Sequence, residues 1–314
     1  MSAGAGTASL VAPRPLLRPT PWQRLSNDAR TLAFLFLLPT IVVLTSVVLY
    51  PFTYALVLSF QDKTAGLPAR FIGLGNYVEL LSDSEFIQIF YNTVWYTAVA
   101  VGIKFVIGLA SALVLNQPRR FNNVYRTILF IPWAVPTVIA SLVWLWVYNE
   151  FNGMLNLLLV RLGVLDTGIA WLAEPAWAMW AVIAVVVWHG TPFYTMHFLA
   201  GLQSIPAELY EAAEIDGAAA RHKFWYITVP SMNSVFTITV MLSTVFTSTS
   251  IVTVNILTNG APANLTQILP NESFNVAITA GRMGLGSAIN MTLFPFLVVL
   301  IVILTRRLLR KDAG

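Results

Sequence analysis

Six long apolar runs constrain the fold of this 314-residue chain more than any other feature. A membrane-spanning helix needs about 20 largely apolar residues, and each run is close to that length or longer. The composition agrees, because only 10% of the residues are charged, against about 25% in a soluble domain. We therefore expect an all-α, polytopic membrane protein with six transmembrane helices. The predicted spans are residues 31–60, 93–115, 127–148, 177–202, 234–256 and 291–308.

The basic residues predict the orientation of the chain, because cytoplasmic segments of membrane proteins carry an excess of Lys and Arg. With the N-terminus inside, thirteen basic residues fall in cytoplasmic segments and four fall outside. Both termini are therefore expected in the cytoplasm of a multi-pass membrane protein. The inside residues are Arg14, Arg18, Arg24, Arg30, Arg119, Arg120, Arg126, Arg221, Lys223, Arg306, Arg307, Arg310 and Lys311, and the outside residues are Lys63, Arg70, Arg161 and Arg282.

The chain divides into one membrane domain and two tails. Residues 1–30 are rich in Pro, Ala and Gly and lack aliphatic runs, which is typical of a disordered segment. We expect a disordered cytoplasmic tail over 1–30, a transmembrane domain over 31–308 and a cytoplasmic C-terminal tail over 309–314.

A polar stretch over residues 204–230 separates the fourth and fifth runs and reads SIPAELYEAAEIDGAAARHKFWYITVP. Pro206 suits the first turn of a helix, and Gly217 predicts a stop and a bend. A second short helix is expected over 219–227, ended by Pro230. This pattern fits an ordinary amphipathic loop and also a docking surface, where small Ala side chains permit close approach and acidic residues give specificity.

Signs of catalysis are absent from the sequence. It contains no cysteine, no G-x-x-x-x-G-K-[ST] phosphate loop and no H-E-x-x-H metal spacing. We therefore expect a non-catalytic chain without a catalytic residue, a metal site or a cofactor of its own. Nothing in the sequence predicts a nucleic-acid partner.

Lys104 is the one Asp, Glu, Lys or Arg residue deep within a predicted span. A charge in the membrane is costly, faces protein or water, and is a candidate functional group. The alternative is structural, in which Lys104 pairs within the protein or extends its amine toward one end of the span.

Polar and aromatic residues mark the two spans that flank the stretch over 204–230. Ser243, Thr247 and Ser250 recur at helical spacing, with Phe246 beside them. On the fourth span, residues 188–193 read WHGTPF and predict an interrupted helix near mid-membrane. Small hydroxyl residues also favour plain helix packing. The alternative is a pathway for a neutral polyhydroxylated solute such as a sugar.

The stretch over 204–230 resembles the signature loop of permease subunits of bacterial ABC importers. That pattern is Glu-Ala-Ala, three residues, Gly, nine residues and Ile-x-Leu-Pro. It is matched at every spacing by Glu211, Ala212, Ala213, Gly217, Ile227 and Pro230, and the departure is Val229 in place of Leu. The segments LQSIPAELY, IDGA, FIGLGNYVELL and LTNGAP resemble the carbohydrate branch of this family, in particular its maltose-type first permease subunits and the permeases of trehalose importers.

The resemblance implies the type I permease fold of ABC importers and a set of partners. The loop would hold a coupling helix seated on a dimer of cytoplasmic ATPase subunits, which carry ATP and Mg²⁺. The other implied partners are a second homologous permease subunit, an external solute-binding lipoprotein, membrane lipids and a sugar. The sugar is expected to be a disaccharide such as trehalose. The implied coupling residues are Glu211, Ala212, Ala213, Asp216, Gly217 and Pro230.

The resemblance also implies a sugar site on the two flanking spans. An alignment without gaps places it at His189, Gly190, Phe193, Ser243, Phe246, Thr247 and Ser250. His189, Thr247 and Ser250 differ in type from the maltose pattern, which implies a different sugar. The main rival is a self-sufficient secondary transporter, which would need paired ionisable groups in its spans. A membrane enzyme or receptor is a second rival.

Overall fold

A computed structural model describes residues 29–117 and 120–312. The predicted tail therefore lies outside the described residues over 1–28, and the inside charges at 14, 18, 24 and 119 lie outside them too. The chain forms two compact units, one ending at Tyr54 and the other beginning at Ala55, which are described separately.

The first unit is a continuous apolar helix that runs into the second. It consists of α2 (Ala29–Leu44), the π-helical turn η1 (Thr45–Leu49) and the start of α3 (Tyr50–Ser59). Pro39 lies inside α2, and the widened turn follows it. Arg30–Ser59 is long and apolar enough to cross a membrane, as predicted for the first span.

Among the described residues, the regular structure of the second unit is helical apart from one two-stranded antiparallel sheet, which pairs Gln61 with Phe71. Its elements are β1 (Gln61–Asp62), β2 (Arg70–Phe71), α4 (Gly75–Ser82), α5 (Ser84–Asn116), α6 (Asn122–Ala134), α7 (Thr137–Val147), α8 (Met154–Arg161), α9 (Ala178–Gln203), α10 (Ala207–Ile215), α11 (Ala220–Lys223), the π-helical turn η2 (Phe224–Thr228), α12 (Val229–Ser231), α13 (Asn233–Thr249), α14 (Val252–Leu257), α15 (Leu269–Phe274), the π-helical turn η3 (Asn275–Thr279) and α16 (Met283–Asp312).

The helices of the described residues confirm the prediction of an all-α polytopic protein. Five helices are long and apolar enough to cross a membrane, and the bent pair α6–α7 makes six if it counts as one span. The bounds of two helices differ most from the prediction. Helix α5 begins at Ser84, nine residues early, because the Asp83 side chain accepts a hydrogen bond from the Glu85 amide. Helix α16 begins at Met283 and continues to Asp312, through the start of the predicted C-terminal tail.

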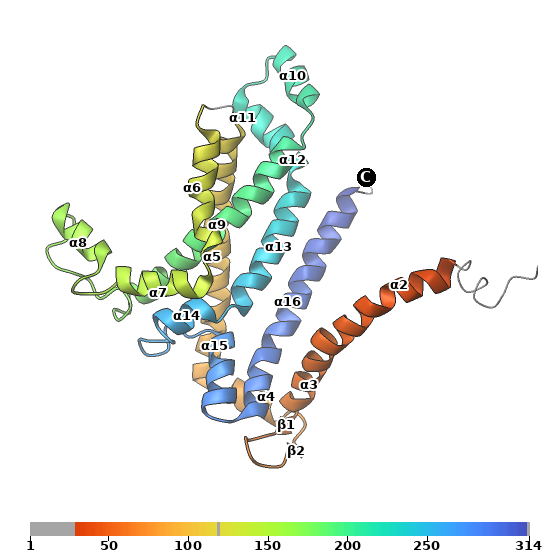
Figure 1. Cartoon of the computed structure of the whole chain (residues 1–314), viewed down its shortest axis with the longest axis vertical. Coiled ribbons are helices and arrows are strands. Elements are labelled where there is room, and N and C mark those ends of the chain that lie inside the picture. Colours follow the sequence, from red (N-terminus) through yellow and green to blue (C-terminus); the bar gives the residue numbers. More distant parts are fainter. Residues whose placement is uncertain (1–28, 118–119, 313–314) are drawn as a thin grey trace, which may run out of the picture. The chain divides into compact units, whose positions relative to one another are not determined.

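The third predicted span is not one straight helix. Helices α6 and α7 meet at an angle of 95° (Figure 1). Val135, between them, has extended backbone angles (φ −81°, ψ 128°) and precedes Pro136. A residue before proline is disfavoured in the helical region, and proline cannot donate the next helical hydrogen bond. Both effects end α6 at Ala134.

The fourth span corrects another prediction, because α9 is continuous through Pro192. Most of α9 is buried, and it packs against α5 through Tyr194 and Phe198, which are fully buried. At Gly108 of α5, a Cβ atom would overlap the Cβ of Tyr194, so glycine permits the close approach of the two helices. Pro192 therefore lies within a continuous helix that is buried over most of its length.

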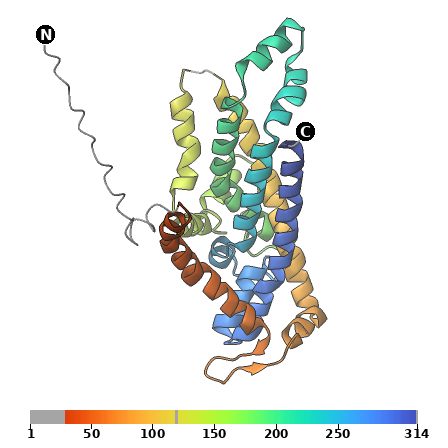
Figure 2. The ribbon, with the colours of Figure 1, turned by 90° about the vertical axis from the view of Figure 1, so that its right-hand side faces the viewer.

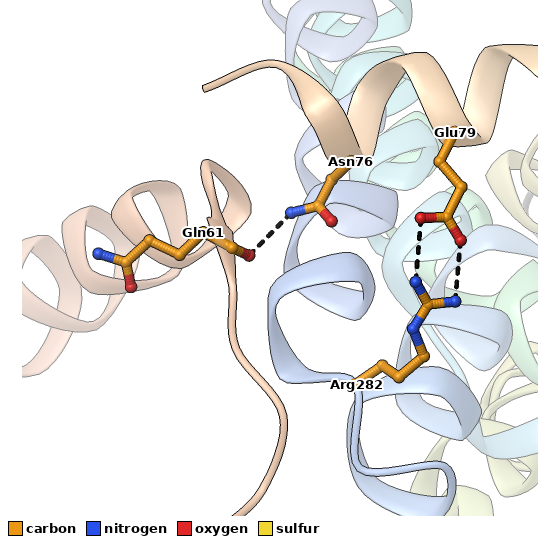
Figure 3. A network of polar contacts seen from close by, with 4 residues as sticks. All are labelled: Gln61, Asn76, Glu79 and Arg282. Atoms are coloured by element: carbon orange, nitrogen blue, oxygen red, sulfur yellow. Dashed lines mark hydrogen bonds and ion pairs between the residues drawn. The ribbon is translucent and has the colours of Figure 1, made fainter. Parts of the chain in front are cut away.

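Polar contacts hold the elements at one end of the second unit. Figures 1 and 2 show α10–α12 at the opposite end of the unit from β1, β2, α4 and α15. The buried Asn76 side chain of α4 donates to the Gln61 carbonyl at 2.9 Å, and Arg282 forms an ion pair with Glu79 at 2.8 Å (Figure 3). The FIGLGNYVELL segment thus contains the predicted short helix, α4. The ion pair between Glu79 and Arg282 connects this helix to the start of α16.

Candidate functional site

One cavity contains all seven residues of the predicted sugar site. Its volume is about 460 Å³, and it lies among α5, α6, α7, α9, α13 and α14. The structure therefore brings together two predicted sets from spans that are separated in sequence by the polar loop. The lining residues are Tyr96, Lys104, Trp133, Thr137, Val186, His189, Gly190, Phe193, Ser243, Phe246, Thr247, Ser250 and Thr253.

A chain of hydrogen bonds runs along one wall of the cavity. The Lys104 ammonium donates to the Thr247 hydroxyl at 2.7 Å, and that hydroxyl donates to the Ser243 carbonyl at 2.6 Å. Lys104 is only 4% exposed, so its amine is buried. A Cβ atom on Gly190 would lie 2.8 Å from Lys104 Cδ, so glycine leaves room for the lysine stem. The Thr247 hydroxyl is thus already engaged within the protein.

Aromatic rings form another part of the wall. Phe193 and Phe246 meet edge to face, with ring centroids 6.2 Å apart. Phe246 is 60% exposed, which leaves much of its surface open to a bound molecule. Such a ring beside hydroxyl groups suits a solute with both apolar and hydroxylated faces.

Two breaks in helical hydrogen bonding meet the cavity. The His189 Nε2 atom lies 3.1 Å from the Val135 carbonyl, at the break between α6 and α7. Ser250 has extended angles and separates α13 from α14. In a membrane, irregular backbone is tolerated where it is buried in protein or lines a cavity. The predicted interruption is therefore present at this cavity, but on the third and fifth spans rather than the fourth.

Five lining residues were missed by the sequence predictions: Tyr96, Trp133, Thr137, Val186 and Thr253. Helical spacing could have found two of them. Tyr96 lies eight residues before Lys104 on the same face of α5, and Thr253 continues the series of hydroxyl residues three positions beyond Ser250.

A second and larger hollow, of about 590 Å³, lies among α5, α6 and α9. Its lining is almost wholly aliphatic and aromatic, with residues such as Ile107, Ile128 and Trp180. It offers few partners to a polar solute, so the smaller, hydroxyl-rich cavity is the better candidate site.

The polar loop forms a helix with a defined end, which confirms the predicted bend at Gly217. The Gly217 amide donates to the Glu214 carbonyl at 3.0 Å, and the Ala218 amide donates to the Ala213 carbonyl at 2.8 Å. Gly217 has φ +72°, the left-handed conformation that favours glycine at this position. The second predicted helix differs, because α11, η2 and α12 continue through Pro230 to Ser231.

The predicted coupling residues lie on an exposed surface. Ala213 is partly covered, and the other five, Glu211, Ala212, Asp216, Gly217 and Pro230, are exposed. Large apolar side chains are exposed beside them, with Ile215 at 88% and Tyr226 also open. An exposed apolar patch rimmed by charged groups is typical of a protein-interaction surface.

An ion pair joins the two halves of this loop. Lys223 Nζ lies 2.6 Å from Glu214 Oε1. The hydrogen bond from Lys223, and then its positive charge, lower the pKa of the Glu214 carboxyl. A lowered folded-state pKa means that the pair stabilises the loop above the usual glutamate pKa of about 4.3. This contribution is lost only as the pH falls through the lowered value, so the pair is present at neutral pH.

Within the described ranges, no group of three or more His, Asp or Glu side chains is placed to hold a metal ion. A polar cavity among apolar spans, with an exposed polar loop, is the arrangement expected of a solute permease. The particular family follows from sequence. Residues 104–312 match the family described as "Binding-protein-dependent transport system inner membrane component", and the chain belongs to it.

This chain is thus the non-catalytic permease subunit of an ABC importer, a multi-pass protein of the inner membrane. No cofactor belongs to this subunit in the family, because ATP is bound by partner ATPase subunits, and transport depends on a separate solute-binding protein. Membership of this family is incompatible with the alternative of a self-sufficient secondary transporter.

Permeases of other organisms are similar in sequence to this chain over most of its length. The trehalose/maltose transport system permease protein MalF of Thermococcus litoralis is 36% identical over 264 residues, which are 84% of this chain and 88% of the relative. The sulfoquinovosyl glycerol transport system permease protein SmoG of Agrobacterium fabrum is 32% identical and spans 96% of this chain and 97% of its own. A bacterial ABC transporter that imports the acidic polysaccharide alginate contains a chain of the same fold, with a TM-score of 0.79, 20% identity, and coverage of 92% of this chain and 98% of its own.

Proposed function

We propose that this permease imports a sugar, of the size of a disaccharide such as trehalose, through the cavity around Lys104. The observation that carries the proposal is that seven residues chosen from sequence line one cavity. Its volume, about 460 Å³, lies within the range of about 300–1,000 Å³ usual for small-molecule sites. The relatives named for trehalose/maltose and for sulfoquinovosyl glycerol support a saccharide as the solute.

The proposed orientation places both termini and the loop over 204–230 in the cytoplasm. It is supported by the thirteen inside and four outside basic residues, since that excess is typical of cytoplasmic segments. In this orientation the exposed face of α10 meets the ATPase dimer. A second homologous permease subunit supplies the other half of the pathway, and the binding protein, anchored as a lipoprotein, delivers solute from outside.

The proposed coupling uses α10 as the element that the ATPase subunits move. ATP binding closes the ATPase dimer. Helix α10 follows, because the coupling surface contacts the dimer. The contacting residues are Glu211, Ala212, Ala213, Asp216, Gly217 and Pro230. The cavity then opens outward to receive the solute. Hydrolysis returns the pair to its inward-facing state and releases the solute inside.

The substitution Gly217→Trp tests the coupling surface, with Gly163→Trp as the matched control. Both glycines follow a helix end with φ near +70°, and both have open space where a side chain would start. Backbone strain is therefore alike, while Gly163 follows α8 on the side predicted to be external. We expect Gly217→Trp to abolish solute-stimulated ATPase activity of the reconstituted complex, with normal membrane insertion.

The control should retain most of that stimulation across a panel of disaccharides that includes trehalose. Equal loss in both variants would show that backbone strain, and not docking, is responsible. Full stimulation in Gly217→Trp would contradict the coupling role. A wild-type complex that no sugar stimulates would contradict the sugar assignment.

A further inference from the structure

Lys104 places a cationic group in the cavity, and no acidic side chain of the described residues forms an ion pair with it. None of the fourteen Asp and Glu residues falls within the six predicted spans. No acidic residue lines the cavity, and the two ion pairs found among the described residues, Glu214–Lys223 and Glu79–Arg282, lie elsewhere. His189, the other titratable nitrogen group of the lining besides the lysine, adds no negative charge.

The structure holds the lysine in place instead of letting it reach water. Thr247 accepts one of its three N–H donors at 2.7 Å, and the Tyr194 ring centroid lies 5.9 Å from Nζ. Gly190 leaves the space that the lysine stem occupies. These contacts fix the amine at the wall of the cavity and leave donors for a bound molecule.

One neutral hydrogen-bond partner does not compensate for the removal of an ammonium group from water. A second positive group in the solute would be repelled, and a neutral hydroxyl would repeat what Thr247 already supplies. A carboxylate or a sulfonate would add the missing opposite charge, with charge-assisted hydrogen bonds that are stronger than neutral ones.

We propose that Lys104 is an anion subsite of the solute cavity, and that the preferred sugar carries a carboxylate or sulfonate group. The proposal rests on the sugar-import function proposed above and narrows it, because trehalose would leave the charge of Lys104 without a counter-ion. Lys104 acts here as a specificity-determining residue, with Thr247 and Gly190 as the residues that position it.

The test uses matched sugar pairs that differ in one acidic group: sulfoquinovosyl glycerol against glucosyl glycerol, and maltobionate against maltose. The complete complex, with its ATPase subunits and binding protein, is reconstituted in liposomes. The concentration for half-maximal ATPase stimulation is measured for each sugar. The ratio between neutral and acidic members is then compared among permease variants, so that the preference of the unchanged binding protein cancels.

We expect Lys104→Met to reduce the preference for the acidic member by about tenfold or more, because it removes a charge-assisted contact. Lys104→Arg should retain most of the preference. Thr247→Val, which removes the anchor but keeps the charge, should reduce it less than Lys104→Met does. The control Lys63→Met makes the same chemical change outside the cavity and should leave the ratio unchanged.

An unchanged ratio in Lys104→Met, while both sugars still stimulate, would overturn the anion subsite and leave the sugar function standing. If Lys104→Met fails to assemble, Lys104→Gln decides, because it also removes the charge while keeping a hydrogen-bond donor, and an unchanged ratio there would overturn the anion subsite. Absence of stimulation of the wild-type complex by every sugar would instead contradict the import function itself. The two acid types show whether the subsite takes both carboxylate and sulfonate.

Discussion

Gly190 decides where the amine of Lys104 lies. An added methyl group would come within 2.8 Å of Lys104 Cδ, closer than such atoms normally approach. In Gly190→Ala the lysine stem must therefore shift, which disturbs the contact between its amine and Thr247. We expect the solute concentration for half-maximal ATPase stimulation to rise about threefold to tenfold, equivalent to the loss of about 1 kcal/mol of binding free energy.

Gly102→Ala is the matched control for this prediction, because no atom lies within 4 Å of the position where its Cβ would stand on α5. That variant should behave as the wild type in the same assay. Equal affinities in Gly190→Ala and Gly102→Ala would show that the lysine adapts without consequence for the solute.

At the scale of residues, the sequence predicted which residues line the cavity better than it predicted their hydrogen-bond partners. The spacing of Ser243 and Thr247 was enough to place two hydroxyl groups on one face of α13, and Ser250, at the break that follows, lines the same cavity. The contact between Lys104 and Thr247 joins residues 143 positions apart. No local pattern encodes such a pair, so the position of the amine could be established only from the packed helices.

At the scale of elements, two prolines in two spans have opposite effects. Helix α6 continues through Pro132 but ends at Ala134, before Val135 and Pro136. Helix α9 passes through Pro192 with buried side chains along most of its length. Burial does not separate the two cases, because α6 passes through Pro132 without a buried residue, and the break is marked by the extended backbone of Val135 before Pro136. The sequence therefore predicted that an interruption exists but assigned it to the wrong span.

The contact between α5 and α9 leads to a prediction about stability. A methyl group at Gly108 would overlap Tyr194 and come within 3.3 Å of the Thr195 backbone nitrogen, which cannot move alone. We expect Gly108→Ala to destabilise the folded permease by about 1–3 kcal/mol, the usual cost of overpacking. A thermal unfolding assay in detergent, with Gly102→Ala on the same helix as the reference, measures the difference. Identical unfolding temperatures would mean that the two helices separate without cost.

At the scale of the whole molecule, the proposed orientation predicts which side of the membrane each loop faces. The chain has no cysteine, so single cysteines can report this directly. Phe121, Phe151 and Ile215 are exposed and lie before α6, after α7 and after α9. If the bent pair α6–α7 crosses the membrane, Phe151→Cys should react with an impermeant maleimide in intact cells. Phe121→Cys and Ile215→Cys should react only after permeabilisation.

A reaction of Phe121→Cys and Phe151→Cys from the same side would show that the bent pair enters and leaves by one face.

Composition predicted the number of apolar runs and their approximate limits, because hydropathy reports burial in lipid directly. It did not predict the 95° bend, since a bent pair and a straight span have the same composition.

The continuous helix α9 connects the cavity to the loop over 204–230, so it can transmit a displacement of the loop to the cavity. About 20 Å of regular helix separates His189 from its end at Gln203, at about 1.5 Å per residue. A rigid rod of that length converts a tilt of about 5° into a displacement of about 2 Å at its far end. The cavity wall on α9 would thus follow the loop with little lag, whereas the wall formed by α6 and α7 contains a joint. The wall on α9 is a continuous helix, and the wall on α6 and α7 contains a bend. A displacement of the loop would therefore change the width of the cavity as well as its position.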